Sequence, residues 1–175
     1  MKLKFYEVNQ EYQSYLKQFE TKIMDSKGIK EKRPYIGIII QIEEYSYFAP
    51  LTSPKPKHLK LKNSMDFLKI DGGVLGAINF NNMIPVKADL FTEKDIEAET
   101  DENYKNLLKK QLTWCNTTTN KDNIIKKAEK LYKEITTKKE KSRLWERCCN
   151  FSLLEEKALE YSQVLEEKKT TTNSL

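Results

Sequence analysis

The sequence has few of the residues from which disulfide frameworks and zinc sites are built. Three cysteines and one histidine, His58, occur among 175 residues, without framework spacing and without a Cys-x-x-Cys pair. Such cysteine usage is typical of a reducing compartment, so we expect a cytoplasmic protein. A zinc site with the usual ligand count is excluded, and we expect neither a metal ion nor a cofactor.

Long apolar runs and glycine-rich nucleotide motifs are also missing. No apolar stretch of about eighteen residues exists, which excludes a membrane-spanning helix and membrane association by that route. The first residues hold no apolar segment long enough for a signal peptide. Neither Gly-x-x-x-x-Gly-Lys nor Gly-x-Gly-x-x-Gly occurs, so nothing indicates an NTP or dinucleotide site.

Charge is abundant, at 33% of all residues, with a net charge of +5. One local stretch is strongly basic and contains a single acidic residue, Asp66; its lysines are Lys55, Lys57, Lys60, Lys62 and Lys69. A basic stretch can bind phosphates, or it can be an ordinary solubilising loop, and charge alone favours the loop.

The hydrophobic pattern changes along the chain from a strand period to a helix period. Residues 36–42 are a β-branched run typical of a strand, and residues 45–51 are expected to be its hairpin partner. Further strands are expected at 5–8, 66–70, 74–80 and 84–86, with a first helix capped by Asn9. Helical spacing dominates after Asp89, with a possible cap at Asp122 and a capping box over 152–155.

These patterns predict an α+β protein with an antiparallel sheet first and helices mostly from the C-terminal half. We expect a single domain over residues 1–165. The remaining residues, 166–175, are charged and then threonine-rich, so we expect a flexible C-terminal tail.

The most informative segment is 50–58, which holds three prolines in its first seven residues. Prolines are unfavourable in a helix interior or a central strand, so we expect an extended, stiffened loop. The loop presents Thr52, Ser53, Lys55, Lys57 and His58 in close succession. Two held hydroxyl groups beside a lysine could clamp an oxyanion or a phosphate. The alternative is a proline-rich surface loop with solvated lysines.

His58 supports three interpretations. As the only imidazole in the chain it is a candidate general acid or base near neutral pH. It could instead stack on RNA bases without transferring a proton, or simply donate a hydrogen bond beside the loop. The residues alone leave these alternatives open.

Aromatic and amide side chains add candidate nucleic-acid contacts. Tyr35 follows Arg33 and precedes the strongest predicted strand, and we expect its ring to be exposed, as rings that stack on bases are. Asn81 lies in an asparagine cluster after a predicted strand. Its amide could read a base edge, but satisfying a turn is the more common role.

Several segments together resemble the ToxN/AbiQ family, the protein toxins of type III toxin–antitoxin systems. The resemblance rests mainly on residues 47–58, 78–86 and 149–157, with support from Phe5-Tyr6 and from Arg33-Pro-Tyr-Ile-Gly37. The matching segments run in order from residue 5 to about 161, so they span nearly the whole chain. Each motif alone is weak, but their common order and spacing are fairly specific.

The resemblance implies a strongly twisted antiparallel sheet with a barrel-like core, similar to MazF/Kid-like toxins, with helices packed on it. It implies a metal-independent, sequence-selective endoribonuclease that acts against phage by abortive infection. The implied partner is an RNA antitoxin, a pseudoknot cut by the toxin from a tandem-repeat transcript. Toxin and RNA would close into a protein–RNA hetero-oligomer, and cellular and phage RNA would be the substrates.

Carried over by motif position, the resemblance implies that Thr52, Ser53 and Lys55 are the catalytic residues. We expect RNA contacts on the basic N-terminal face, from Arg33, Tyr35, Lys57, His58, Lys60, Lys62 and Asn81. A closed ring also needs a second RNA surface, for which the candidates are lysines at 126–133 and 138–141. A solvated helix face is the alternative for these lysines.

Two other classes of function remain open beside the nuclease. A non-catalytic RNA-binding module would use the same basic loop, and a protein-interaction adaptor would use the helical half. The nuclease and the RNA-binding module are distinguished by whether substitution of Ser53 or Lys55 stops cleavage while leaving RNA binding intact. The adaptor predicts no RNA affinity and therefore no salt dependence of binding.

Overall fold

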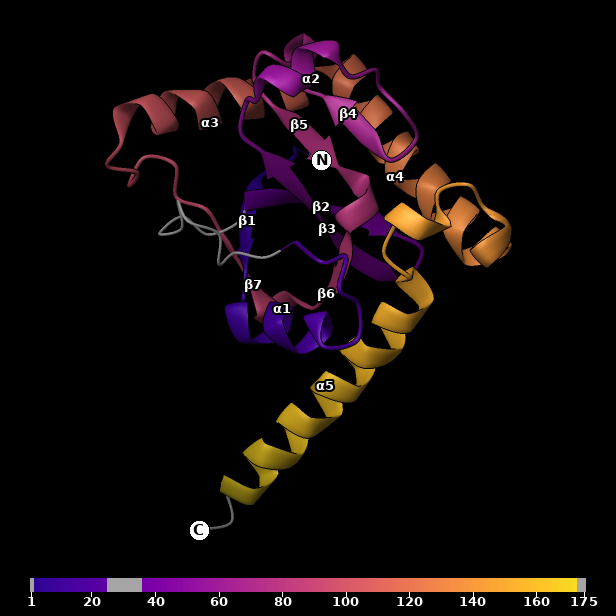
Figure 1. The fold of residues 1–175 in the computed structure, drawn as a ribbon. Helices are drawn as coiled ribbons and strands as arrows, with labels where there is room; N and C mark the ends of the chain where they lie inside the picture. Colours follow the sequence, from indigo (N-terminus) through magenta and orange to yellow (C-terminus); the bar gives the residue numbers. More distant parts are fainter. Residues whose placement is uncertain (1, 25–35, 173–175) are drawn as a thin grey trace.

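The computed structural model describes residues 2–24 and 36–172, in which a central sheet formed by the first half of the chain is surrounded by helices (Figure 1). The strands are β1 Phe5–Val8, β2 Ile36–Ile42, β3 Tyr45–Thr52, β4 Phe67–Lys69, β5 Ala77–Asn79, β6 Ile84–Val86 and β7 Phe91–Glu93. The helices are α1 Gln10–Lys17, α2 Pro56–Lys60, α3 Glu102–Cys115, α4 Thr118–Lys138 and α5 Phe151–Thr172.

The seven strands form an antiparallel sheet in the order β4-β5-β3-β2-β1-β7, with β6 paired to β3. Strand β3 is the branch point. Its first residues, Ser46 to Phe48, pair with β6, whereas its last residues, Leu51 and Thr52, pair with β5. The far end of β3 therefore leaves the main sheet and enters the β4–β5 hairpin.

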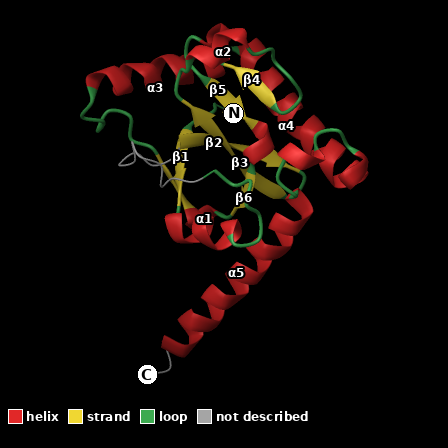
Figure 2. Ribbon diagram, viewed as in Figure 1, coloured by secondary structure: helices red, strands yellow, loops and turns green. Residues whose placement is uncertain are grey.

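The helices cover the sheet and bury a continuous apolar core (Figure 2). Helix α4 packs on β2, while α5 packs on β6 and on α1. Two fully buried tyrosines tie these layers together through their hydroxyl groups: Tyr12 donates to the Pro85 carbonyl at 2.7 Å, and Tyr47 donates to the Glu155 carboxylate at 2.6 Å. This α+β arrangement confirms the fold class expected from the sequence.

The sheet is open, which corrects the barrel-like core that the resemblance implied. Strands β4 and β7 lie at the two ends of the strand order and are not paired with each other within the described residues. The closer likeness to MazF/Kid-like toxins therefore stays a prediction.

Several element boundaries differ from those expected, each for a local reason. Helix α4 begins at Thr118, not after Asp122. The residue before it, Thr117, has an extended backbone and is the N-cap residue. At the start of α5 the Asn150 side chain accepts the Leu153 amide, the role expected of Ser152. The short strand β7 was missed, since three residues carry too little pattern to be recognised.

Helix α5 continues through Thr172, across most of the segment expected to be a tail, and its C-terminal part extends away from the sheet (Figure 1). The domain limits 1–165 and 166–175 stay predictions. Among the described residues, no helix has the length and apolar character needed to cross a bilayer.

Candidate active site

The segment 50–58 is more regular than the extended loop expected from its prolines. Pro50 lies inside β3, paired with Gly37 of β2. It sits between the residues that pair with β6 and those that pair with β5, where β3 changes neighbours, so a missing N–H is tolerated. Pro56 is the first residue of α2, where its fixed φ suits a helix start. Only residues 53–55 form a connection between strand and helix.

The three candidate catalytic side chains lie on the 52–55 connection, which consists of Thr52 at the end of β3 and of residues 53–55. Thr52 is half-buried, and its hydroxyl donates to the Ala77 carbonyl of β5 at 3.5 Å. Ser53 and Lys55 are exposed. Lys55 is the extended N-cap residue of α2, and its carbonyl accepts the His58 amide at 2.9 Å. The sheet thus fixes one end of the connection and α2 fixes the other.

Two glycines of the turn after β4 hold both ends of this connection in place. Gly76 has φ +102° and lies so close to the chain that an added Cβ would overlap the Thr52 carbonyl oxygen. Gly73 has φ +97°, and a Cβ there would lie 2.7 Å from the His58 carbonyl oxygen. Only glycine combines this backbone conformation with so close an approach. The contact of Gly73 and Gly76 with segment 52–58 leaves no local pattern in the sequence.

His58 is buried, with 2% of its surface exposed, and its ring packs on Phe67 with the centroids 5.8 Å apart. Its Nδ1 atom has no hydrogen-bond partner among the described residues. Burial, together with the positive charges of Lys55 and Lys57, lowers the pKa of the imidazole. The ring is therefore buried in this structure, and its expected place among the RNA-binding residues stays a prediction.

The lysines expected to bind RNA surround this site. Lys57 and Lys60 lie on α2, and Lys62 lies just after it; all three are exposed. Within the described ranges, no acidic group lies within ion-pair distance of these three lysines or of Lys55. The positive charge of this corner is therefore not neutralised by neighbouring side chains.

Asn81 makes local hydrogen bonds of the kind that the turn interpretation describes, and its expected RNA contact stays a prediction. Its side-chain amide donates to the Arg147 carbonyl at 3.2 Å, and its backbone carbonyl accepts the Cys149 amide at 2.8 Å. These bonds attach the chain before α5 to the end of β5, so the amide satisfies local structure as the turn interpretation proposed. Arg33 and Tyr35, the other two candidates, lie outside the described residues.

Helical residues from the second half brace the segment that follows α2. The Lys127 ammonium donates to the Ser64 carbonyl at 2.6 Å, and burial lowers its pKa while the Asp66 carboxylate opposes that effect. Asp66 is nearly buried, and it accepts from Arg147 and from the Ser64 hydroxyl, each at 2.8 Å. Lys127 lies in the lysine run proposed as a second RNA surface, and its contact with Ser64 leaves no local sequence pattern from which it could be predicted.

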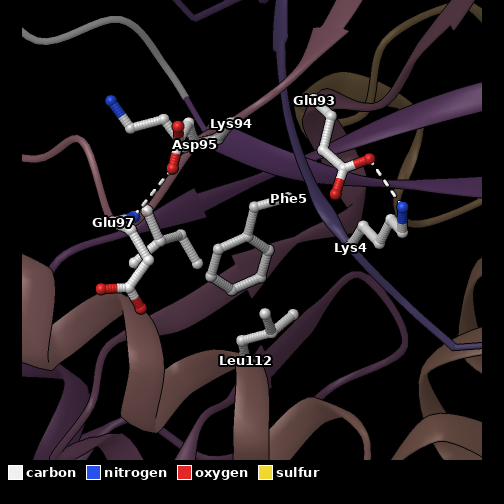
Figure 3. Close-up of a pocket in the computed structure, with 8 residues that line it drawn as sticks. Lys4, Phe5, Glu93, Lys94, Asp95, Glu97 and Leu112 are labelled. Carbon is white, nitrogen blue, oxygen red and sulfur yellow. Dashed lines mark hydrogen bonds and ion pairs between the residues drawn. The ribbon is translucent and has the colours of Figure 1, made fainter.

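A separate pocket of about 440 Å³ lies between β1, the segment after β7 and α3 (Figure 3). Its floor includes Phe5 and Leu112, but the charges at its rim are already paired. Lys4 binds Glu93 at 2.7 Å, and Asp95 accepts the Glu97 amide at 2.9 Å. In residues 2–24 and 36–172, no three His, Cys, Asp or Glu side chains gather as a metal site would require. The 52–55 connection remains the best candidate site.

Comparison with known proteins shows the family to which this chain belongs. The family model described as toxin ToxN of the type III toxin–antitoxin system matches residues 4–159. An endoribonuclease ToxN from Bacillus thuringiensis subsp. kurstaki is 35% identical over 166 residues, covering 91% of this chain and 84% of the relative.

Two solved structures are similar over nearly their whole length. One, from work on selective toxin inhibition by a non-coding RNA pseudoknot in type III systems, has a TM-score of 0.77 and 33% identity, covering 93% of this chain and 99% of that one. The other is AbiQ, a lactococcal anti-phage endoribonuclease of a type III system, with a TM-score of 0.76, 27% identity and the same coverage of both chains. The fold and these matches define a bacterial toxin of a toxin–antitoxin system. Within that class, the chain belongs to the ToxN toxin family of type III systems, as the resemblance predicted.

Proposed function

We propose that this toxin is an endoribonuclease whose active centre is the 52–55 connection. The observation that carries the proposal is the placement of Ser53 and Lys55. Both are exposed on a short connection that is fixed at Thr52 by β5 and Gly76 and at His58 by Gly73. A preorganised hydroxyl and ammonium group can stabilise charge as it develops on a phosphate, with little reorganisation during the reaction.

The proposed reaction uses the substrate's own 2′-hydroxyl as nucleophile. Attack on the adjacent phosphorus displaces the 5′-oxygen and leaves a 2′,3′-cyclic phosphate and a 5′-hydroxyl. Lys55, with the hydroxyls of Thr52 and Ser53, stabilises the negative charge on the phosphate oxygens. This route requires no metal ion, so we expect cleavage to continue in EDTA and to stop on a substrate with 2′-deoxyribose at the cut site.

The proposed partner is an RNA antitoxin that covers this site and that the toxin itself cuts from a longer transcript. Support comes from the similar structure concerned with inhibition by an RNA pseudoknot and from Lys57, Lys60 and Lys62, which are exposed and form no ion pair with another described residue. Free toxin would cut cellular and phage RNA in the cytoplasm, whereas toxin in a closed protein–RNA assembly would be inactive.

The test separates catalysis from binding. Ser53→Ala and Lys55→Ala should each lower the cleavage rate about a hundredfold or more, the loss typical of one oxyanion donor. Both variants should be tolerated in cells without the antitoxin, and both should retain RNA binding. Ser14→Ala and Lys110→Ala, at exposed positions of α1 and α3, are the matched controls and should stay toxic. Full cleavage by both site variants would show that the active centre lies elsewhere, whereas RNA binding without cleavage by the wild type would leave only a non-catalytic RNA-binding module.

A further inference from the structure

Exposed apolar side chains gather at the corner of the molecule that carries the candidate site. Leu59 is 59% exposed, Leu61 is 44% exposed and Val74 is 60% exposed. The other large exposed hydrophobic residues of the described chain are Phe19, Leu159 and Val164, on or beside α1 and α5. Single exposed apolar residues need no explanation, but a group of them beside a binding site indicates a contact surface.

These residues lie on α2, at its C-cap and on the turn after β4, two elements that the packing of the site brings into contact. Gly73 and His58 touch through their backbones, and the residues that directly follow them are Val74 and Leu59. Leu61 is the C-cap residue of α2, with its amide bonded to the Lys57 carbonyl at 3.0 Å. Figure 1 shows α2 above the β4–β5 hairpin, at the opposite end of the molecule from the free end of α5.

Lysines alternate with these apolar residues along the chain. Lys57, Lys60 and Lys62 are exposed, and none of them forms an ion pair within the described ranges. An apolar surface framed by free positive charge suits a ligand that offers apolar faces and regularly spaced negative charges. Unstacked single-stranded RNA has both, because each nucleotide supplies one base face and one phosphate.

We propose that Leu59, Leu61 and Val74 form an apolar surface that supports unstacked bases of the RNA beside the cut site, while Lys57, Lys60 and Lys62 bind the flanking phosphates. This inference rests on the proposed function and adds a binding subsite to it. Aliphatic side chains contact any base, so the subsite requires unpaired nucleotides rather than a particular sequence. It makes the enzyme select single-stranded RNA next to the scissile bond.

The experiment compares two pairs of substitutions on similarly exposed residues. Leu59→Ser with Val74→Ser removes the surface, and Leu159→Ser with Val164→Ser makes the same chemical change on α5. On a short RNA that the wild type cleaves at a mapped position, the first pair should raise KM about tenfold or more with little change in kcat, and the second pair should change neither. The salt dependence of binding should stay as in wild type, because no phosphate contact is lost. By contrast, Lys57→Ala with Lys60→Ala should lower the log–log salt slope by roughly 0.7 per lost phosphate contact.

A substrate with abasic nucleotides beside the cut site identifies the RNA group involved. The abasic RNA should weaken binding to the wild type, and it should weaken binding to the Leu59/Val74 variant much less, because the contact is already absent. Equal weakening in both proteins, or an unchanged KM in the Leu59/Val74 variant, would overturn the subsite. An unchanged KM together with loss of a co-purifying protein would assign the surface to a protein partner instead.

Binding measured in the Lys55→Ala background keeps this proposal separate from the catalytic one. The triple variant combines Lys55→Ala with Leu59→Ser and Val74→Ser. If Lys55→Ala fails to reduce cleavage, the assignment of the active centre fails, but a weaker affinity of the triple variant for single-stranded RNA still supports the apolar surface. If Lys55→Ala abolishes cleavage and the triple variant binds as the single variant does, the surface is wrong and the active centre stands.

Discussion

At the scale of single residues, the site depends on a backbone contact that no side chain provides. Gly76 approaches the Thr52 carbonyl so closely that any Cβ would displace one of the two backbone segments. Gly72, four residues earlier in the same turn, also has a positive φ of +62°, but an added Cβ would meet nothing within 4 Å. Substitution of Gly72 therefore introduces backbone strain alone, whereas substitution of Gly76 introduces the same kind of strain together with a steric clash at the site.

We expect Gly72→Ala to cost about 1–2 kcal/mol of stability, the usual cost of left-handed backbone in a residue with a Cβ, and to leave kcat unchanged. Gly76→Ala should cost more stability and should also reduce kcat, because the strain is accompanied by movement of Thr52 and Ser53. Thermal denaturation and single-turnover cleavage measure the two effects. Equal kcat in both variants would show that the position of Thr52 does not matter for cleavage.

His58 gives a second residue-scale prediction, about pH. Burial and two nearby lysines lower the pKa of His58 in the folded state below its unfolded value, so the folded state disfavours the proton. Stability from the neutral ring is complete above the unfolded pKa of about 6.5 and is lost as the pH falls toward the folded pKa. Urea denaturation between pH 7.5 and 5 should therefore show falling stability in the wild type, and a smaller fall in His58→Gln. Parallel curves for the two proteins would contradict a buried neutral imidazole.

At the scale of elements, helix α4 and the chain before α5 brace the loop that follows α2. Arg147 is half-exposed, but its partner Asp66 has only 6% of its side chain exposed. Removing the arginine leaves a nearly buried carboxylate with only the Ser64 hydroxyl as a side-chain donor. Such an under-satisfied group typically costs about 1–3 kcal/mol.

Arg147→Ala should therefore lower the free energy of unfolding by about 1–3 kcal/mol in urea denaturation. Lys4→Ala is the control, because it removes an ion pair whose partner Glu93 is half-exposed, and such surface pairs contribute roughly 0–1 kcal/mol. If both variants lose the same small amount, Asp66 is solvated well enough without its arginine.

Most elements could be predicted because their patterns are local. The β-branched run of β2, the Asn9 cap of α1 and the helical spacing in α3 to α5 are each visible within a few turns of chain. Pro50 inside β3 could not be predicted, because its tolerance depends on where two other strands begin and end. The catalytic candidates came from a motif, whereas their supports, Gly73, Gly76 and Lys127, act across long sequence separations that leave no periodic signal.

At the scale of the whole molecule, the lysine row on α4 is the proposed second RNA surface. Lys126, Lys130 and Lys133 are exposed, whereas Lys127 is bound to Ser64 in the loop after α2. The N-terminal part of the row therefore adjoins the basic corner of the candidate site.

Charge reversal of Lys126, Lys130 and Lys133 to Glu should weaken the antitoxin contact and prevent closure of the protein–RNA assembly, as measured by native mass spectrometry. The same reversal at exposed Lys87 and Lys110 serves as the control. A closed assembly that persists with the α4 variant would remove the row from the RNA interface without affecting the nuclease assignment.

The bracing of Ser64 and Asp66 by Lys127 and Arg147 has a consequence for the timing of synthesis. The ribosome makes the catalytic segment early, but it makes the groups that secure the surrounding structure near the end of the chain. A nascent chain that has not yet reached Arg147 therefore has its catalytic side chains but lacks these late braces of the segment after α2. We expect nascent and prematurely terminated chains to be harmless, so that antitoxin RNA is needed only once translation of each toxin molecule is almost finished.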